Sequence, residues 1–130
     1  MFQKMLQGGS GGGSEMIKTL WTGDLTALNS EIILSENVDN FEAIQIDFYM
    51  NGDGDSRLSS VVLSKNVIDT QKSHYDDTTS KTCTMSMFAN INWYAWIAVK
   101  IKDNKLKIVE KMIGPSASYA GIVAVHGIKY

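Results

Sequence analysis

The chain has 130 residues, with 12 Lys and Arg side chains against 14 Asp and Glu, and a formal net charge of -2 at pH 7. Its length predicts a single domain, since domains of about 100–150 residues are the commonest. The hydrophobic fraction of 44% argues against disorder and the net charge against nucleic-acid binding, and no apolar run approaches the roughly 18–20 residues of a membrane span.

The first 14 residues differ in composition from the rest. Residues 8–14 read Gly-Gly-Ser-Gly-Gly-Gly-Ser, which predicts a flexible linker pure enough to indicate an engineered one. Residues 1–7 are either an inert leader or a tethered peptide. Phe2, Met5 and Leu6 have the spacing that puts side chains on one face of a helical turn, so we expect them to form the contacts if this peptide docks. Residues 15–130 then form the folded domain.

The first half of this domain predicts short strands separated by turns, at 17–22, 31–34, 41–50 and 57–64. In the third strand Ile44, Ile46 and Phe48 recur at every second position, which is typical of a half-buried strand.

Residues 51–55 read Asn-Gly-Asp-Gly-Asp, which predicts the tip of a hairpin. Their side-chain oxygens have the spacing of a calcium loop, but Ser56 and Val62 stand where that loop needs Gly and Glu. We therefore predict no metal site, and a weak cation contact at this turn is the alternative.

The second half predicts a long polar loop at 65–80, holding at most a short strand at 67–68. Further strands follow at 82–89, 92–102, 105–113 and 121–130. The strands at 92–102 and 105–113 form a hairpin through a two-residue turn. About eight strands with no convincing helical period predict an all-β fold, an antiparallel, jelly-roll-like β-sandwich.

Motifs at the two ends carry a resemblance to a known family. Residues 18–23 read Lys-Thr-Leu-Trp-Thr-Gly, residues 31–44 read Glu-Ile-Ile-Leu-Ser-Glu-Asn-Val-Asp-Asn-Phe-Glu-Ala-Ile, and residues 126–130 read His-Gly-Ile-Lys-Tyr. These motifs resemble the start and the end of small C-terminal β domains in phage tail fibres and baseplate receptor-binding proteins. His126 departs from the family pattern, in which an aromatic residue is common at that place.

The resemblance implies a trimeric module of the virion, made in the host cytoplasm and carried on the phage tail or surface fibre. Such a module attaches to a host cell-surface saccharide without catalysis. The alternative is a purely structural virion module that binds other virion proteins or the tethered N-terminal peptide.

The polar segment His74, Tyr75, Asp76 and Asp77 is the candidate ligand site. An imidazole, a phenol and two carboxylates can hold a sugar by hydrogen bonds and stacking, and a solvated loop is the alternative. Hydrolysis needs carboxylates about 5–9.5 Å apart across the scissile bond, whereas neighbours on an extended chain point apart. We therefore predict no catalytic residues, no enzyme activity and no cofactor.

Tyr94 and Trp96 are the candidates for interface or stacking contacts. On a strand they point away from Trp93, which we assign to the core because its face also carries Ile97 and Val99. Tyr94 and Trp96 then form either a stacking platform for a ligand or anchors between subunits.

Four further interpretations follow from the pattern. We expect Cys83 to be a buried or half-buried strand residue, Trp21 to belong to the core, and His126 to be hydrogen-bonded within the fold. A group of lysines on the predicted hairpin is expected to protect a sheet edge from pairing, and it comprises Lys100, Lys102, Lys105, Lys107 and Lys111.

Overall fold

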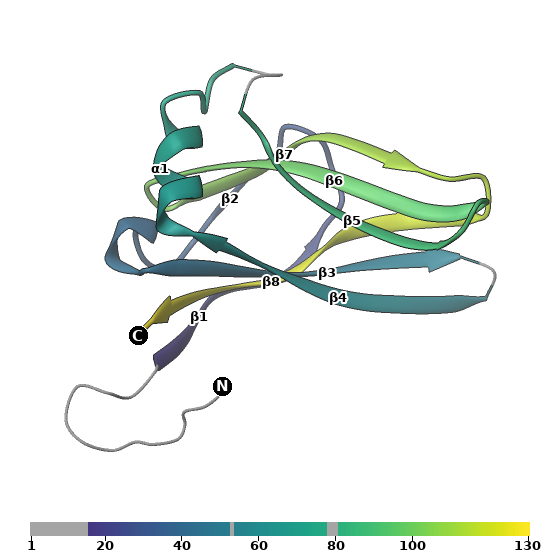
Figure 1. Ribbon diagram of the computed structural model, residues 1–130, viewed down its shortest axis with the longest axis horizontal. Coiled ribbons are helices and arrows are strands. Elements are labelled where there is room, and N and C mark those ends of the chain that lie inside the picture. Colours follow the sequence, from purple (N-terminus) through teal and green to yellow (C-terminus); the bar gives the residue numbers. More distant parts are fainter. Residues whose placement is uncertain (1–15, 53, 78–80) are drawn as a thin grey trace.

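The computed structural model describes residues 16–52, 54–77 and 81–130, which form a sandwich of two four-stranded sheets (Figure 1). The first sheet has the strand order β1-β8-β3-β4 and the second has the order β2-β7-β6-β5. The strands are β1 (Met16–Leu25), β2 (Glu31–Ile33), β3 (Ala43–Gly52), β4 (Asp55–Ser64), β5 (Cys83–Asn90), β6 (Trp93–Lys102), β7 (Lys105–Ile113) and β8 (Ala117–Lys129). All paired strands are antiparallel, so the predicted eight-stranded antiparallel sandwich is confirmed.

The core lies between the two sheets and follows the two-residue period of the strands. Ile46 and Met50 of β3 are 0% exposed, and their neighbours in the chain point to the outer face and are half-buried. Trp93 and Cys83 are buried, as predicted, whereas Trp21 is half-buried and packs against the core from outside it.

The prediction of a loop from residue 65 was wrong, because Lys65–Lys72 forms a helix, α1. The Ser64 side chain caps its start by accepting a hydrogen bond from the Val67 N–H, at 3.4 Å. A short 3-10 helix, η1 (Val38–Asn40), is the other helical segment among the described residues. The signal for α1 was weak because only Ile68 and Gln71 are buried on this eight-residue helix, too few to give a period.

Gln71 continues the hydrogen bonding of β6 where β5 ends. The β5–β6 ladder reaches only to the pair Cys83 and Val99, so the backbone of Ile101 lies beyond it. The Gln71 side chain is 2% exposed. Its Oε1 accepts from the Ile101 N–H at 2.9 Å, and its Nε2 donates to the Ile101 carbonyl. A primary amide has the donor and acceptor of a peptide group, so this side chain takes the place of a strand.

Three predicted features of the chain lie outside the described residues. They are the leader at residues 1–7 with its contact residues Phe2, Met5 and Leu6, the linker at 8–14, and Asp53 at the hairpin tip between β3 and β4. Neither helix in the described part of the chain has the length and apolar character needed to cross a bilayer.

The contact of Gln71 with β6 gives a test of stability. Gln71→Leu leaves the buried N–H and carbonyl of Ile101 without partners, so we expect the free energy of unfolding to fall by about 2–4 kcal/mol in urea denaturation. Asn66→Leu, at an exposed position of the same helix, is the matched control and should change it by less than about 0.5 kcal/mol. Equal stability of the Gln71→Leu variant and the parent chain would contradict the role of Gln71.

Candidate functional site

The outer face of the second sheet carries a group of large side chains that we call the aromatic platform: Phe88, Tyr94, Trp96 and Met112. Phe88 of β5 is 72% exposed and lies opposite Tyr94 of β6. Their rings stack with centroids 6.4 Å apart and planes inclined by 20°. Trp96 follows on β6 opposite Met112 of β7, which is 49% exposed. Tyr94 and Trp96 are half-buried and lie on the other face of β6 from the buried Trp93, as the alternation predicted.

Two features of the sequence produce this surface. Residues 82–99 carry no charged side chain, so the β5–β6 hairpin presents only apolar and neutral polar groups. Gly114 lets the Tyr94 ring lie against the chain that follows β7, because a Cβ atom there would lie 2.6 Å from Tyr94 Cε2. The Gly114 N–H donates to the Tyr94 carbonyl at 2.8 Å, which holds the two segments together.

The aromatic platform has neutral hydroxyl groups beside it. Ser86 lies opposite Trp96 on β5, and Thr84 follows on the same face; both are exposed. Flat aromatic rings with hydroxyl donors and acceptors beside them can bind a sugar ring by stacking and hydrogen bonds. They can equally bury the apolar side chains of a protein.

The predicted ligand residues 74–77 lie in the turn after α1, and the structure separates their roles. Tyr75 is 3% exposed, and its hydroxyl donates to Glu31 Oε2 at 2.8 Å. The Nζ atoms of Lys107 and Lys105 lie 4.3 and 5.3 Å from the centre of its ring. Burial raises the pKa of Tyr75, and the hydrogen bond to Glu31 is the second largest cause of this rise. Tyr75 therefore anchors the turn on the sheet, and its ring is covered.

The other three residues of this segment lie closer to solvent. His74 Nδ1 is 2.9 Å from Asp77 Oδ2, while Asp76 and Asp77 are exposed. The carbonyl of His74 accepts a hydrogen bond from Nζ of Lys100, a residue of β6 that is 0% exposed. The turn thus covers one end of the outer face of the second sheet, and the aromatic platform occupies the other end.

The lysines of the β6–β7 hairpin do not protect a sheet edge, so that prediction was wrong. β6 and β7 are the inner strands of their sheet. Lys105 and Lys107 flank Tyr75, and Lys100 holds the His74 carbonyl. Lys111 donates to the carbonyls of Thr26 and Ala120, and burial lowers its pKa. The ammonium groups of Lys100, Lys105, Lys107 and Lys111 therefore make contacts within the fold.

A polar network that the sequence did not reveal crosses the outer face of the first sheet. His126 Nε2 is 2.8 Å from Asp47 Oδ2, and its Nδ1 is 3.0 Å from Thr19 Oγ1. Asp47 Oδ1 accepts from Ser60 Oγ at 2.6 Å and from Gln45 Nε2 at 2.9 Å. Burial acts to raise the pKa of Asp47, but the hydrogen bonds from Ser60, Gln45 and His126 outweigh it and hold the pKa below its usual value. His126 is thus hydrogen-bonded within the fold, as predicted.

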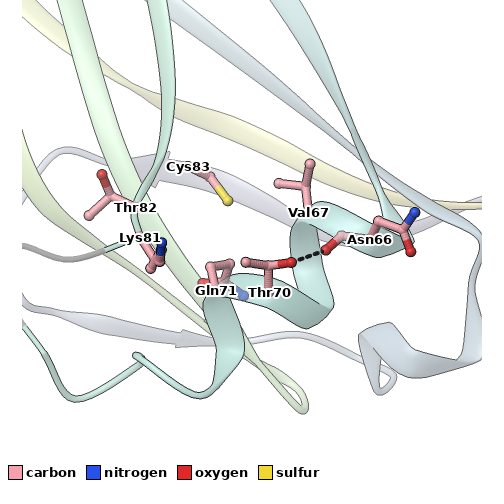
Figure 2. A pocket seen from close by; sticks show the side chains of 7 residues that line it. All are labelled: Asn66, Val67, Thr70, Gln71, Lys81, Thr82 and Cys83. Atoms are coloured by element: carbon pink, nitrogen blue, oxygen red, sulfur yellow. Dashed lines mark hydrogen bonds between the residues drawn. The ribbon is translucent and has the colours of Figure 1, made fainter.

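A hollow of about 290 Å³ lies between α1 and the start of β5 (Figure 2). Its lining consists of Asn66, Val67, Thr70, Gln71, Lys81, Thr82 and Cys83. Burial raises the pKa of the Cys83 thiol to about 11, so the thiol is protonated at neutral pH and is a poor nucleophile. The hollow therefore presents a mainly apolar wall with no activated group at Cys83.

Comparisons with known proteins identify no relative of this chain, so a functional conclusion has to rest on the geometry of the structure. No protein-family model matches the chain, and no curated protein matches its sequence significantly. Within residues 16–52, 54–77 and 81–130, no cluster of three or more His, Cys, Asp or Glu side chains is arranged to hold a metal ion.

The network around Asp47 gives a test of pH dependence. A carboxyl group with a pKa lower in the folded than in the unfolded chain stabilises the fold above its unfolded pKa, near 4, and this stabilisation is lost as the pH falls. Asp47→Asn should lower the free energy of unfolding at pH 7 by about 1–2 kcal/mol, since it weakens the charged hydrogen bonds. It should also flatten the decline of stability below about pH 4.

Chemical denaturation between pH 2.5 and 7 measures both effects. Asp76→Asn is the control, because that carboxylate is exposed on the turn after α1 and its removal should leave the stability at pH 7 unchanged. The same decline below pH 4 in the parent chain and in Asp47→Asn would show that Asp47 does not contribute to it.

Proposed function

We propose that this chain is a non-catalytic attachment module that binds a saccharide on the aromatic platform. One observation carries the proposal: Phe88 is 72% exposed and stacks on Tyr94, beside Trp96, on an open sheet face. Large exposed apolar groups that cluster on a small domain mark binding surfaces, because their contact with water is unfavourable. A sugar ring offers the matching chemistry, with a C–H face for the aromatic rings and hydroxyl groups at its margin.

The neutral character of the β5–β6 hairpin favours a neutral sugar over a charged ligand, and the exposed Glu110 of β7 lies beside it, opposite Ala98. The hairpin that supplies three of the four platform residues has no charge between residues 82 and 99, and Ser86 and Thr84 supply hydroxyl groups beside Trp96. Binding that depends on stacking and neutral hydrogen bonds is expected to change little with salt concentration, since there is little charge to screen.

The resemblance of the end motifs to phage tail fibre and baseplate domains supplies the biological setting of the proposal. In that setting the ligand is a saccharide of the host cell surface, and the module is carried on the virion.

A second candidate function is binding of another virion protein through the same surface. Ile91, 80% exposed at the turn between β5 and β6, favours it. A protein partner would bury this side chain, whereas a sugar stacked on the rings does not need it.

Alanine variants at the platform test the proposal. A glycan array and a host-cell pulldown with the full chain should show binding that falls at least about tenfold in Trp96→Ala and in Phe88→Ala. The reason is that each variant removes a stacking ring, worth roughly 1.4 kcal/mol or more. Urea denaturation of each variant should confirm that the fold remains.

Two controls separate the platform from other surfaces. Tyr119→Ala removes a 62% exposed aromatic ring on β8 of the other sheet, and Asp76→Asn alters the turn after α1. Both should bind like the parent chain. Binding lost with Asp76→Asn but kept with Trp96→Ala would move the site to residues 74–77. Capture of a virion protein, with no glycan bound, would favour the second candidate function.

A further inference from the structure

The outer edge of β4 differs from the other sheet edges. Among the described residues β4 has a strand neighbour on one side only, β3, and eight of its ten residues are exposed. Leu58 is 75% and Val62 is 53% exposed, and residues 58–64 carry no charge. Figure 1 shows β4 at the lower right of the molecule, beside β3. Such an edge is a template for another strand.

The other edges carry features that hinder pairing. β1 has Lys18 and two register shifts, β2 has only three residues, and β5 has a register shift between Phe88 and Asn90. The β3–β4 ladder runs from Ala43 and Ser64 to Gly52 and Asp55 with no shift. Charges, bulges and short strands are the usual means of keeping edges apart, and β4 lacks all three between residues 58 and 64.

The backbone direction along β4 follows from one hydrogen bond. The Lys65 N–H donates to the Glu42 carbonyl at 3.0 Å, directly beyond the pair Ala43 and Ser64. In an antiparallel ladder every second residue directs its polar backbone groups to the same neighbour, so the odd-numbered residues of β4 face β3. The even-numbered residues then direct their N–H and carbonyl groups to the outer edge, and they are Ser56, Leu58, Ser60, Val62 and Ser64.

We propose that a second copy of this chain pairs along β4, antiparallel, with the two-fold axis at Ser60. This register joins all five outward-directed residues of one copy to the five of the other. It sets Leu58 opposite Val62 of the second copy, so the two most exposed apolar side chains of the strand cover each other twice.

The charges at the two ends of the pairing support this register. With the axis at Ser60, Asp55 at the start of β4 comes level with Lys65, the first residue of α1, in the second copy, and the same juxtaposition repeats at the other end. Moving the axis by one residue to Val61 brings Arg57 level with Lys65, and like charges opposite each other are unfavourable. The register centred on Ser60 is therefore favoured by charge over the register centred on Val61.

The pairing has a consequence that rests on the proposed function. A two-fold axis through Ser60, perpendicular to the sheet, joins the two first sheets into one and leaves both second sheets on the same side. The two aromatic platforms then face the same way, which permits one dimer to bind two saccharides of one cell surface and gain avidity. A two-fold assembly also differs from the three-fold assembly that the family resemblance implies.

The molecular mass of the full chain in solution tests the pairing. Sedimentation should give a dimer of twice 14.4 kDa that dissociates on dilution. Ser60→Pro removes an N–H that points to the outer edge and not to β3, together with the hydroxyl that donates to Asp47. Urea denaturation should show that this variant folds with lower stability, and it should sediment as a monomer. Leu58→Lys, a second variant at an exposed side chain, should weaken the dimer at least tenfold. Tyr119→Lys, on the outer face of β8, is its matched control and should leave the dimer unchanged.

Cysteine variants test the register. Ser60→Cys places two thiols opposite each other across the axis, at a separation of about 5.5 Å between Cα atoms, which a disulfide can bridge. Mild oxidation should give a covalent dimer. Ser56→Cys is the matched control on the same strand face and should stay uncrosslinked, because it lies opposite Ser64 of the second copy. The native Cys83 is buried and should not react.

Three results would overturn the pairing: a monomer at every concentration, a trimer unchanged by Ser60→Pro, or equal crosslinking of the two cysteine variants. None of these results bears on the proposed function, because the platform of a single copy can bind a saccharide in the array whether or not the copies pair.

Discussion

The rest of the structure depends on one constraint: the buried polar groups of β6 need hydrogen-bond partners along the whole strand. This strand pairs with β7 from Ala95 to Lys102, but β5 accompanies it only as far as Val99. The remaining backbone at Ile101 is bonded by the Gln71 side chain, and the buried Lys100 is bonded by the His74 carbonyl. Because buried polar groups without partners are costly, α1 and the turn after it must lie where they do. The segment predicted to be a loop thus completes the hydrogen bonding of the second sheet through the Gln71 side chain.

This arrangement divides the outer face of the second sheet into two ends. At one end Tyr75 lies across β7, bonded to Glu31 and flanked by Lys105 and Lys107, so charged side chains are used within the fold. At the other end no turn of the described chain covers the aromatic platform, and the neutral β5–β6 hairpin meets solvent there. The charged end is covered and the apolar end is open, and this exposed apolar surface is the one on which the proposed function rests.

The candidate site was predictable from the sequence only in part. Alternation placed Trp93 in the core and Tyr94 and Trp96 on the outer face, because successive side chains of any strand point to opposite sides. Phe88 and Met112 were not recognised as their neighbours, since this depends on the register of β5 and β7 with β6. His74, Tyr75, Asp76 and Asp77 looked like one polar group, yet Tyr75 is buried by contacts with residues far away in the chain.

The sequence by itself determined the class of fold, most strand positions and the faces of the strongest strand. These are local properties, governed by the two-residue period and by turn-forming residues such as Asp103 and Asn104. Only the tertiary structure decided which faces stay open, which lysines are buried, and that His126 meets Asp47 across β8 and β3. The physical reason is that these contacts join residues brought together by strand register, and register is set by the packing of the whole sandwich and not by any one segment.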